Sequence, residues 1–135
     1  MKKRILFLIN IFVLSLVYIT SAQDISDGNI TSGPVNGALV VVGGGPLDEV
    51  ILQRFIDLAG GPEAIIVVVP TAGGRESYNE DSGGAGQLRK YGATNVTVLH
   101  TNDRKIADTD AFVQPLLAAK AVWFGGGRQW RLVDA

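Results

Sequence analysis

Three glycine-rich turns contain the residues of this sequence whose types and spacing best suit a functional site. Residues 43–45, 73–74 and 125–127 each come at the end of a run of apolar, largely β-branched residues. A ligand can approach the backbone of a glycine closely, because glycine has no Cβ. If the apolar runs are parallel strands, the turns leave the carboxyl ends of those strands, where such sheets bind their ligands. We therefore expect the functional site at that edge of the sheet.

The first turn does not complete a nucleotide-binding motif. Gly43, Gly44 and Gly45 lie between a predicted strand and a predicted helix, but the pattern G-x-G-x-x-G needs glycine where Asp48 stands. A carboxylate there would repel a pyrophosphate at the helix N-terminus. No Gly-Lys-Ser or Gly-Lys-Thr sequence of a phosphate-binding loop occurs either. A dinucleotide site is therefore disfavoured, and a turn with a purely structural role is an alternative.

Composition restricts nucleophilic and metal chemistry. The chain has no Cys and a single His, His100, which excludes thiol catalysis, Cys-ligated clusters and zinc ribbons. None of its serines has glycine at both −2 and +2, as the elbow G-x-S-x-G requires. We expect His100 to end a strand without a catalytic role, and a serine paired with it is the alternative. No metal site and no cofactor are predicted.

The elements that must position the turns alternate between strand and helix. Continuous apolar runs predict buried strands, and amphipathic spacing with terminal glycines predicts helices. This alternation predicts an α/β fold, with a parallel sheet covered by helices on both faces in three layers. The predicted strands are 38–42, 64–69, 96–99 and 121–124, and the predicted helices are 47–59, 86–91, 110–120 and 128–135.

The first 22 residues have the pattern of a secretory signal peptide. Three basic residues at 2–4 precede an apolar run over 5–19, and small residues follow at 20–22. The run is shorter than the ~20 residues of a membrane-spanning helix, which favours cleavage over an anchor. We expect a secreted or periplasmic chain, with a polar tail over 23–36 and one α/β domain over 37–135.

Four segments, taken in their order and spacing, are more specific than any single motif. They read LVVVGGG at 39–45, IIVVVPTA at 65–72, YGA at 91–93 and AVWFGGGRQWRL at 121–132. Together they resemble the N-terminal half of the cyanophycinase family of serine peptidases, which are relatives of dipeptidase E. The resemblance covers nearly all of residues 37–135, and its last segment is the most specific. It implies a class I glutamine amidotransferase-like, flavodoxin-like fold.

The resemblance also implies roles for particular residues. It puts Gly126 and Gly127 beside the nucleophile, where backbone N–H groups would stabilise the oxyanion of a tetrahedral intermediate. Gln129 matches the glutamine that lines the family's substrate pocket, and the turn of residues 43–45 is expected to bind substrate as well. The implied substrate is a peptide cut next to aspartate. Cyanophycinases release β-Asp-Arg dipeptides from a polymer of Asp and Arg.

The catalytic Ser, His and acid of the family have no counterparts in this sequence. In the family they follow the segment matched here, and the sequence ends at Ala135. His100 lies before that point and does not match the family's histidine. We therefore expect the N-terminal part of a peptidase domain, inactive by itself. The alternatives are an inactive truncated product, a non-catalytic α/β domain that binds a small anionic ligand, and an amidotransferase-like domain that uses Cys.

Charge bears on the expected partners. Removal of residues 1–22 takes three of the 12 basic residues and none of the 13 acidic ones, which leaves a net charge of −4. An acidic domain without a basic stripe argues against nucleic acid as a partner. We expect a peptide substrate that can contain Asp and Arg, no membrane contact after cleavage, and a homodimer as a candidate oligomeric state. Asn29 and Asn95 begin Asn-x-Thr glycosylation acceptor sequences, a pattern that chance produces often.

Overall fold

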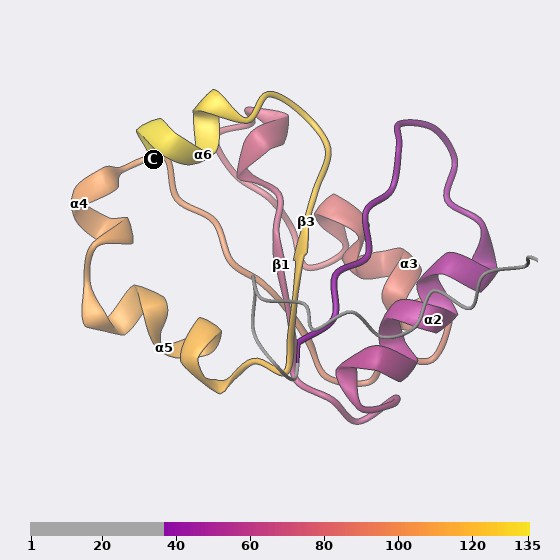
Figure 1. Cartoon of the computed structure of the whole chain (residues 1–135). Helices are drawn as coiled ribbons and strands as arrows, with labels where there is room; N and C mark the ends of the chain where they lie inside the picture. The colour runs from indigo at the N-terminus through magenta and orange to yellow at the C-terminus, as the bar shows by residue number, and fades with distance from the viewer. Residues whose placement is uncertain (1–36) are drawn as a thin grey trace, which may run out of the picture. The chain divides into compact units, whose positions relative to one another are not determined.

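A three-stranded parallel sheet lies at the centre of the computed structural model, which describes residues 37–135 (Figure 1). The predicted signal peptide, the polar tail and the acceptor sequence at Asn29 lie outside the described residues. In chain order the elements are α2 (Glu49–Ala59), β1 (Ile66–Val69), η1 (Thr71–Gly73), η2 (Ser82–Gly84), α3 (Ala85–Lys90), β2 (Val96–Val98), α4 (Arg104–Ala107), α5 (Asp110–Ala118), β3 (Ala121–Phe124) and α6 (Trp130–Asp134), where η1 and η2 are single 3-10 turns.

Strand β1 is the central strand, and the sheet order is β2-β1-β3. In the parallel register, Val67 of β1 lies opposite Thr97 of β2 on one side and Val122 of β3 on the other. Because β1 has partners on both sides, its first three residues are fully buried. Within the described residues β3 pairs with β1 alone, and Phe124 at its end is 62% exposed.

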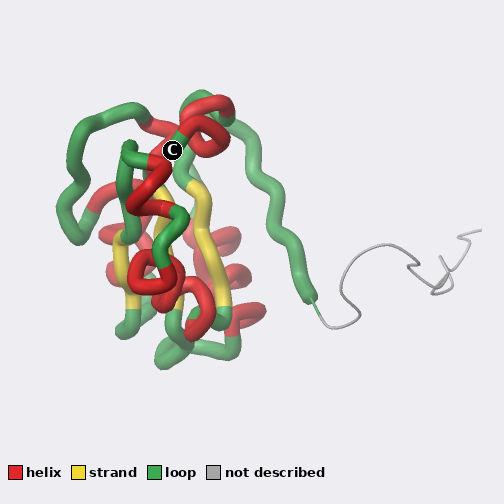
Figure 2. Tube along the Cα trace, turned by 90° about the vertical axis from the view of Figure 1, so that its left-hand side faces the viewer, coloured by secondary structure: helices red, strands yellow, loops and turns green. Residues whose placement is uncertain are grey.

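Helices cover both faces of the sheet. Helices α2 and α3 lie on one side of it, and α4 and α5 lie on the other (Figure 1). Figure 2, turned so that α4 and α5 face the viewer, shows the strands behind them. The chain runs from β1 outward to β2 and then back across β1 to β3, and right-handed crossovers in opposite directions place their helices on opposite faces. The prediction of a parallel sheet flanked by helices is confirmed.

The ends of helix α2 follow from its sequence. The Asp48 side chain caps the first turn by accepting a hydrogen bond from the amide of Val50, at 3.0 Å. The helix ends at Gly60, which adopts the left-handed conformation with φ of 111°. Between them Leu52 and Ile56 are fully buried and pack in one core with Leu88 of α3 and with β1. The helix predicted over 47–59 is confirmed within two residues.

The strand predicted over 38–42 is wrong. The segment belongs to no strand, and Leu39 and Val41 are 87% and 83% exposed. In Figure 2 it is the part of the green trace that joins the grey one, and it runs away from the sheet. An apolar, β-branched run forms a strand only where a neighbouring strand pairs with its N–H and C=O groups. Strand β1 cannot offer that pairing, because β2 and β3 occupy both of its sides, and within the described residues the outer edges of β2 and β3 do not pair with the segment either.

The remaining helices differ from the predictions mainly at their ends. Helix α3 begins one residue early, α5 ends two residues early and keeps Pro115 inside it, and α6 is shorter than predicted. Helix α4 is an addition to the predicted elements, capped by the Asp103 side chain at the amide of Lys105. No helix within residues 37–135 combines the length and apolar character needed to cross a bilayer.

Leu52→Ala tests whether the α2 core stabilises this sheet. We expect the substitution to lower the free energy of unfolding by about 2–5 kcal/mol, because it leaves a cavity in a fully buried site. Val50→Ala on the same helix is the matched control, since Val50 is 72% exposed and should change stability by less than about 0.5 kcal/mol. Equal losses in urea denaturation would show that α2 does not pack as described.

Candidate functional site

The turns that follow β1 and β3 come together at the carboxyl edge of the sheet. The chain leaves β1 toward β2 on one side, whereas β3 lies on the other side of β1, so the strand order reverses at β1. In open parallel sheets, a crevice for ligands forms where the strand order reverses in this way. Two of the three glycine turns singled out by sequence, residues 73–74 and 125–127, therefore meet at one edge as predicted.

The backbone carbonyl of Ala72 joins these two turns. It accepts a hydrogen bond from the amide of Arg128 at 2.9 Å and one from Nη1 of Arg131 at 3.1 Å. Just before them, the amide of Gly125 donates to the carbonyl of Val69 at 3.0 Å, as the last bond of the β1–β3 ladder. Ala72 itself is buried. We call the contacts of Ala72 with Arg128 and Arg131 the seam, since they hold the β3 turn against η1.

Only glycine fits at position 127 of the seam. Gly127 has φ of 149°, and a β-carbon built on it would overlap the carbonyl oxygen of Ala72. Gly126 is different, because a β-carbon there would meet no atom within 4 Å. The close approach of the two turns therefore depends on the missing side chain at one position of the pair.

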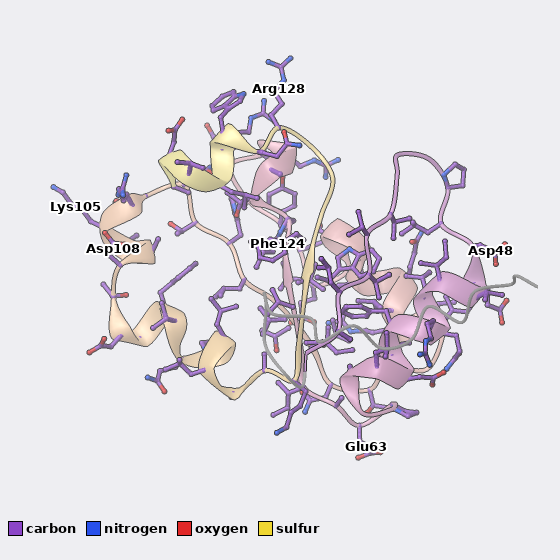
Figure 3. All side chains as sticks on the ribbon, in the orientation of Figure 1. Asp48, Glu63, Lys105, Asp108, Phe124 and Arg128 are labelled. Atoms are coloured by element: carbon purple, nitrogen blue, oxygen red, sulfur yellow. The ribbon has the colours of Figure 1, made fainter. Side chains whose placement is uncertain are left out.

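The amide N–H groups of Gly126 and Gly127 have no hydrogen-bond partner within residues 37–135. Both residues are exposed. Gln129 follows in the turn that leads into α6; it is exposed, and its side chain does not cap the helix. Figure 3 shows the Arg128 side chain between them extending outward from the same edge. The turn thus offers two backbone donors and an unused side-chain amide.

The turn of residues 43–45 stands apart from this site. A β-carbon on any of its three glycines would meet nothing within 4 Å, and no hydrogen bond within the described residues joins it to residues 125–129. In Figure 1 the segment before α2 rises to the same end of the sheet as the turn after β3 but is separated from it. A contact of residues 43–45 with substrate stays a prediction.

Sequence reasoning missed a second polar group at the same edge. The Thr71 hydroxyl lies 2.9 Å from Nδ1 of His100, and Thr71 is only 4% exposed. The Tyr78 ring packs edge-on against the imidazole, with ring centroids 4.6 Å apart. The alternative of a serine paired with His100 is wrong for residues 37–135, since Nδ1 bonds Thr71 and Nε2 has no partner there, so neither Ser77 nor Ser82 binds the ring. One sequence feature could have indicated this contact. Thr71 and His100 each come two residues after the end of a strand, and the two strands are parallel neighbours.

No group of three or more His, Asp or Glu side chains within residues 37–135 is placed to hold a metal ion. Comparisons of the chain with protein-family models, with curated proteins and with solved structures find no match.

Gly127→Ala tests the seam against a matched neighbour. We expect it to lower the free energy of unfolding by about 1–3 kcal/mol, because alanine would adopt an unfavourable φ and overlap Ala72. Gly126→Ala should change it by less than about 0.5 kcal/mol, since the space there is open. Thermal unfolding of the two variants measures the difference, and equal effects would contradict the described packing.

Proposed function

We propose that residues 37–135 form the oxyanion-stabilising and substrate-binding part of a serine peptidase of the cyanophycinase type. The observation that carries the proposal is the turn after β3, in which Gly126 and Gly127 are exposed residues whose amides make no hydrogen bond within residues 37–135, while the seam holds the turn in place. The turn lies in the sequence segment whose resemblance to the family is most specific.

The strand order supports the fold that this family implies. Counted from β1, the order β2-β1-β3 is that of the first three strands of a flavodoxin-like sheet, whose full order is 2-1-3-4-5. Residues 38–42, which open the resemblance, belong to no strand and are left out of this count. In such sheets the ligand lies at the switch point beside the carboxyl ends of the first and third strands. The turns after β1 and β3 occupy that place here.

Hydrolysis of a peptide bond requires hydrogen-bond donors that are in place before the reaction begins. When a hydroxyl attacks an amide carbonyl, the carbonyl oxygen becomes an anion, and fixed N–H groups lower the energy of that state. The amides of Gly126 and Gly127 would supply such donors, and the absence of side chains allows the carbonyl to approach them. Gln129, two residues further on, would bind a carbonyl or a carboxylate of the peptide through its side-chain amide.

The same donors favour a second candidate function. Two free backbone N–H groups next to each other also suit a small anion that is bound without any chemistry. No serine of residues 37–135 stands on a G-x-S-x-G turn, so the nucleophile is not assigned to any of them. The two functions differ in their ligand, because a peptidase site should prefer an aspartyl peptide to a simple anion.

A titration of the ¹⁵N-labelled chain with the dipeptide β-Asp-Arg, followed by NMR, tests the proposal. We expect the largest amide shifts at Gly126 and Gly127 and weaker effects of acetate or phosphate at the same concentration. Gln129→Ala should raise the dissociation constant about three- to tenfold, the worth of one hydrogen bond. Gln87→Ala, at an exposed glutamine on α3, is the control and should leave it unchanged.

Three results would contradict the proposal. Shifts confined to residues away from the carboxyl edge would remove the site, and equal affinity for dipeptide and acetate would favour the anion-binding alternative. Hydrolysis of the dipeptide by this chain would place a nucleophile among residues to which the proposal assigns none.

A further inference from the structure

Side chains that the proposed function does not use connect the turns after β1 and β2 at the carboxyl edge. They lie next to the seam, which reaches the turn after β3. Thr71 follows β1, and its hydroxyl is hydrogen-bonded to Nδ1 of His100, which follows β2. Thr71 is the first residue of η1, and the next residue is Ala72, the acceptor of the seam. The contact between Thr71 and His100 therefore lies one residue from the carbonyl that holds the turn after β3.

The imidazole has one polar anchor within the described residues. Its Nε2 atom is buried and makes no hydrogen bond there, so the bond to the Thr71 hydroxyl is the polar contact that sets the ring's orientation. The Tyr78 ring packs against the imidazole from the side, and the Tyr78 hydroxyl accepts a hydrogen bond from the amide of Arg75 at 3.2 Å. The side chain of Asn102, from the turn after β2, donates to the carbonyl of Arg75 at 3.1 Å.

These contacts restrain η1 from the side opposite to the seam. On one side His100 and Tyr78 hold the turn after β1, and on the other side its Ala72 carbonyl binds Arg128 and Arg131. The buried Thr71 hydroxyl is the point where the two sets of contacts meet. A shift of η1 at Thr71 would move the Ala72 carbonyl and weaken both hydrogen bonds of the seam, because hydrogen-bond strength falls steeply with distance and angle.

We propose that Thr71 and His100 are positioning residues, whose hydrogen bond fixes η1 in the orientation in which the Ala72 carbonyl binds Arg128 and Arg131. Those two bonds in turn position the turn that carries Gly126 and Gly127. Neither residue touches the ligand in this proposal, since Thr71 is buried and acts through the backbone of the next residue. The use of the turn for an oxyanion rests on the proposed function, whereas the coupling of His100 to the turn after β3 does not.

Amide hydrogen exchange of Arg128 in Thr71→Val and Thr71→Ser tests the coupling. The valine variant keeps the shape of the side chain and loses the hydroxyl, so we expect the Arg128 amide to exchange about three- to tenfold faster, as for loss of one ordinary hydrogen bond. The serine variant keeps the hydroxyl and should return the rate to within about twofold of the starting chain. The Lys120 amide, bonded to the carbonyl of Ile65 at the other end of β3, is the internal reference and should not change.

Two further variants complete the design. His100→Phe keeps a ring against Tyr78 but loses Nδ1, so it should speed exchange at Arg128 as Thr71→Val does. Thr94→Val is the matched control, because its hydroxyl bonds the carbonyl of Pro62 at the amino end of the sheet. It should leave Arg128 unchanged.

Two results would overturn the proposal. An unchanged Arg128 rate in Thr71→Val would show that the hydroxyl does not act on the seam. Equal acceleration at Arg128 and Lys120, or a fold that is lost altogether and is not restored by serine, would show a general contribution to stability instead. The exchange rates are measured without any peptide, so failure of the dipeptide titration would not affect this result.

Discussion

The carbonyl oxygen of Ala72 accepts two hydrogen bonds, one from the Arg128 amide in the turn after β3 and one from the Arg131 side chain in α6, and the geometry of the candidate site depends on them. Adjacent strands β1 and β3 bring the two turns to the same edge, but the ladder between them ends at Gly125. Beyond that residue the chain would be free to leave the sheet in many directions. The bonds from Arg128 and Arg131 to a buried carbonyl select one of them, and they leave the amides of Gly126 and Gly127 exposed.

The glycines of this edge make that contact sterically feasible. A β-carbon on Gly127 would overlap the Ala72 carbonyl, and one on Gly74 would overlap the guanidinium of Arg131. Both residues also have positive φ, so glycine is required for the conformation as well as for the space. Glycine weakens the interior of a helix or a strand. In these two turns it instead allows one backbone to pack directly against the other. The same close approach of backbone would admit the carbonyl of a peptide.

The sequence allowed the sheet and the large helix to be predicted, and it failed where structure depends on distant partners. Strand 121–124 and the capped helix α2 are marked by local features, namely an apolar run followed by glycines and an Asp–Gly pair of caps. Residues 38–42 carry an equally strong strand pattern, yet no neighbouring strand pairs with them. The four residues of α4 are too few to show periodicity. The contact of Thr71 with His100 was missed because it spans 29 positions and requires knowing that β1 and β2 are neighbours.

The scalar coupling across the hydrogen bond between the amide nitrogen of Arg128 and the carbonyl carbon of Ala72 tests the seam most directly. It can be measured by NMR on the chain labelled with ¹³C and ¹⁵N, with no substitution and no ligand. We expect a coupling similar to that between Gly125 and Val69, since the two donor–acceptor distances are 2.9 and 3.0 Å. Detection of the Gly125 coupling without the Arg128 coupling would show that the sheet forms while the turn after β3 is not held by Ala72, and it would contradict this account of the site.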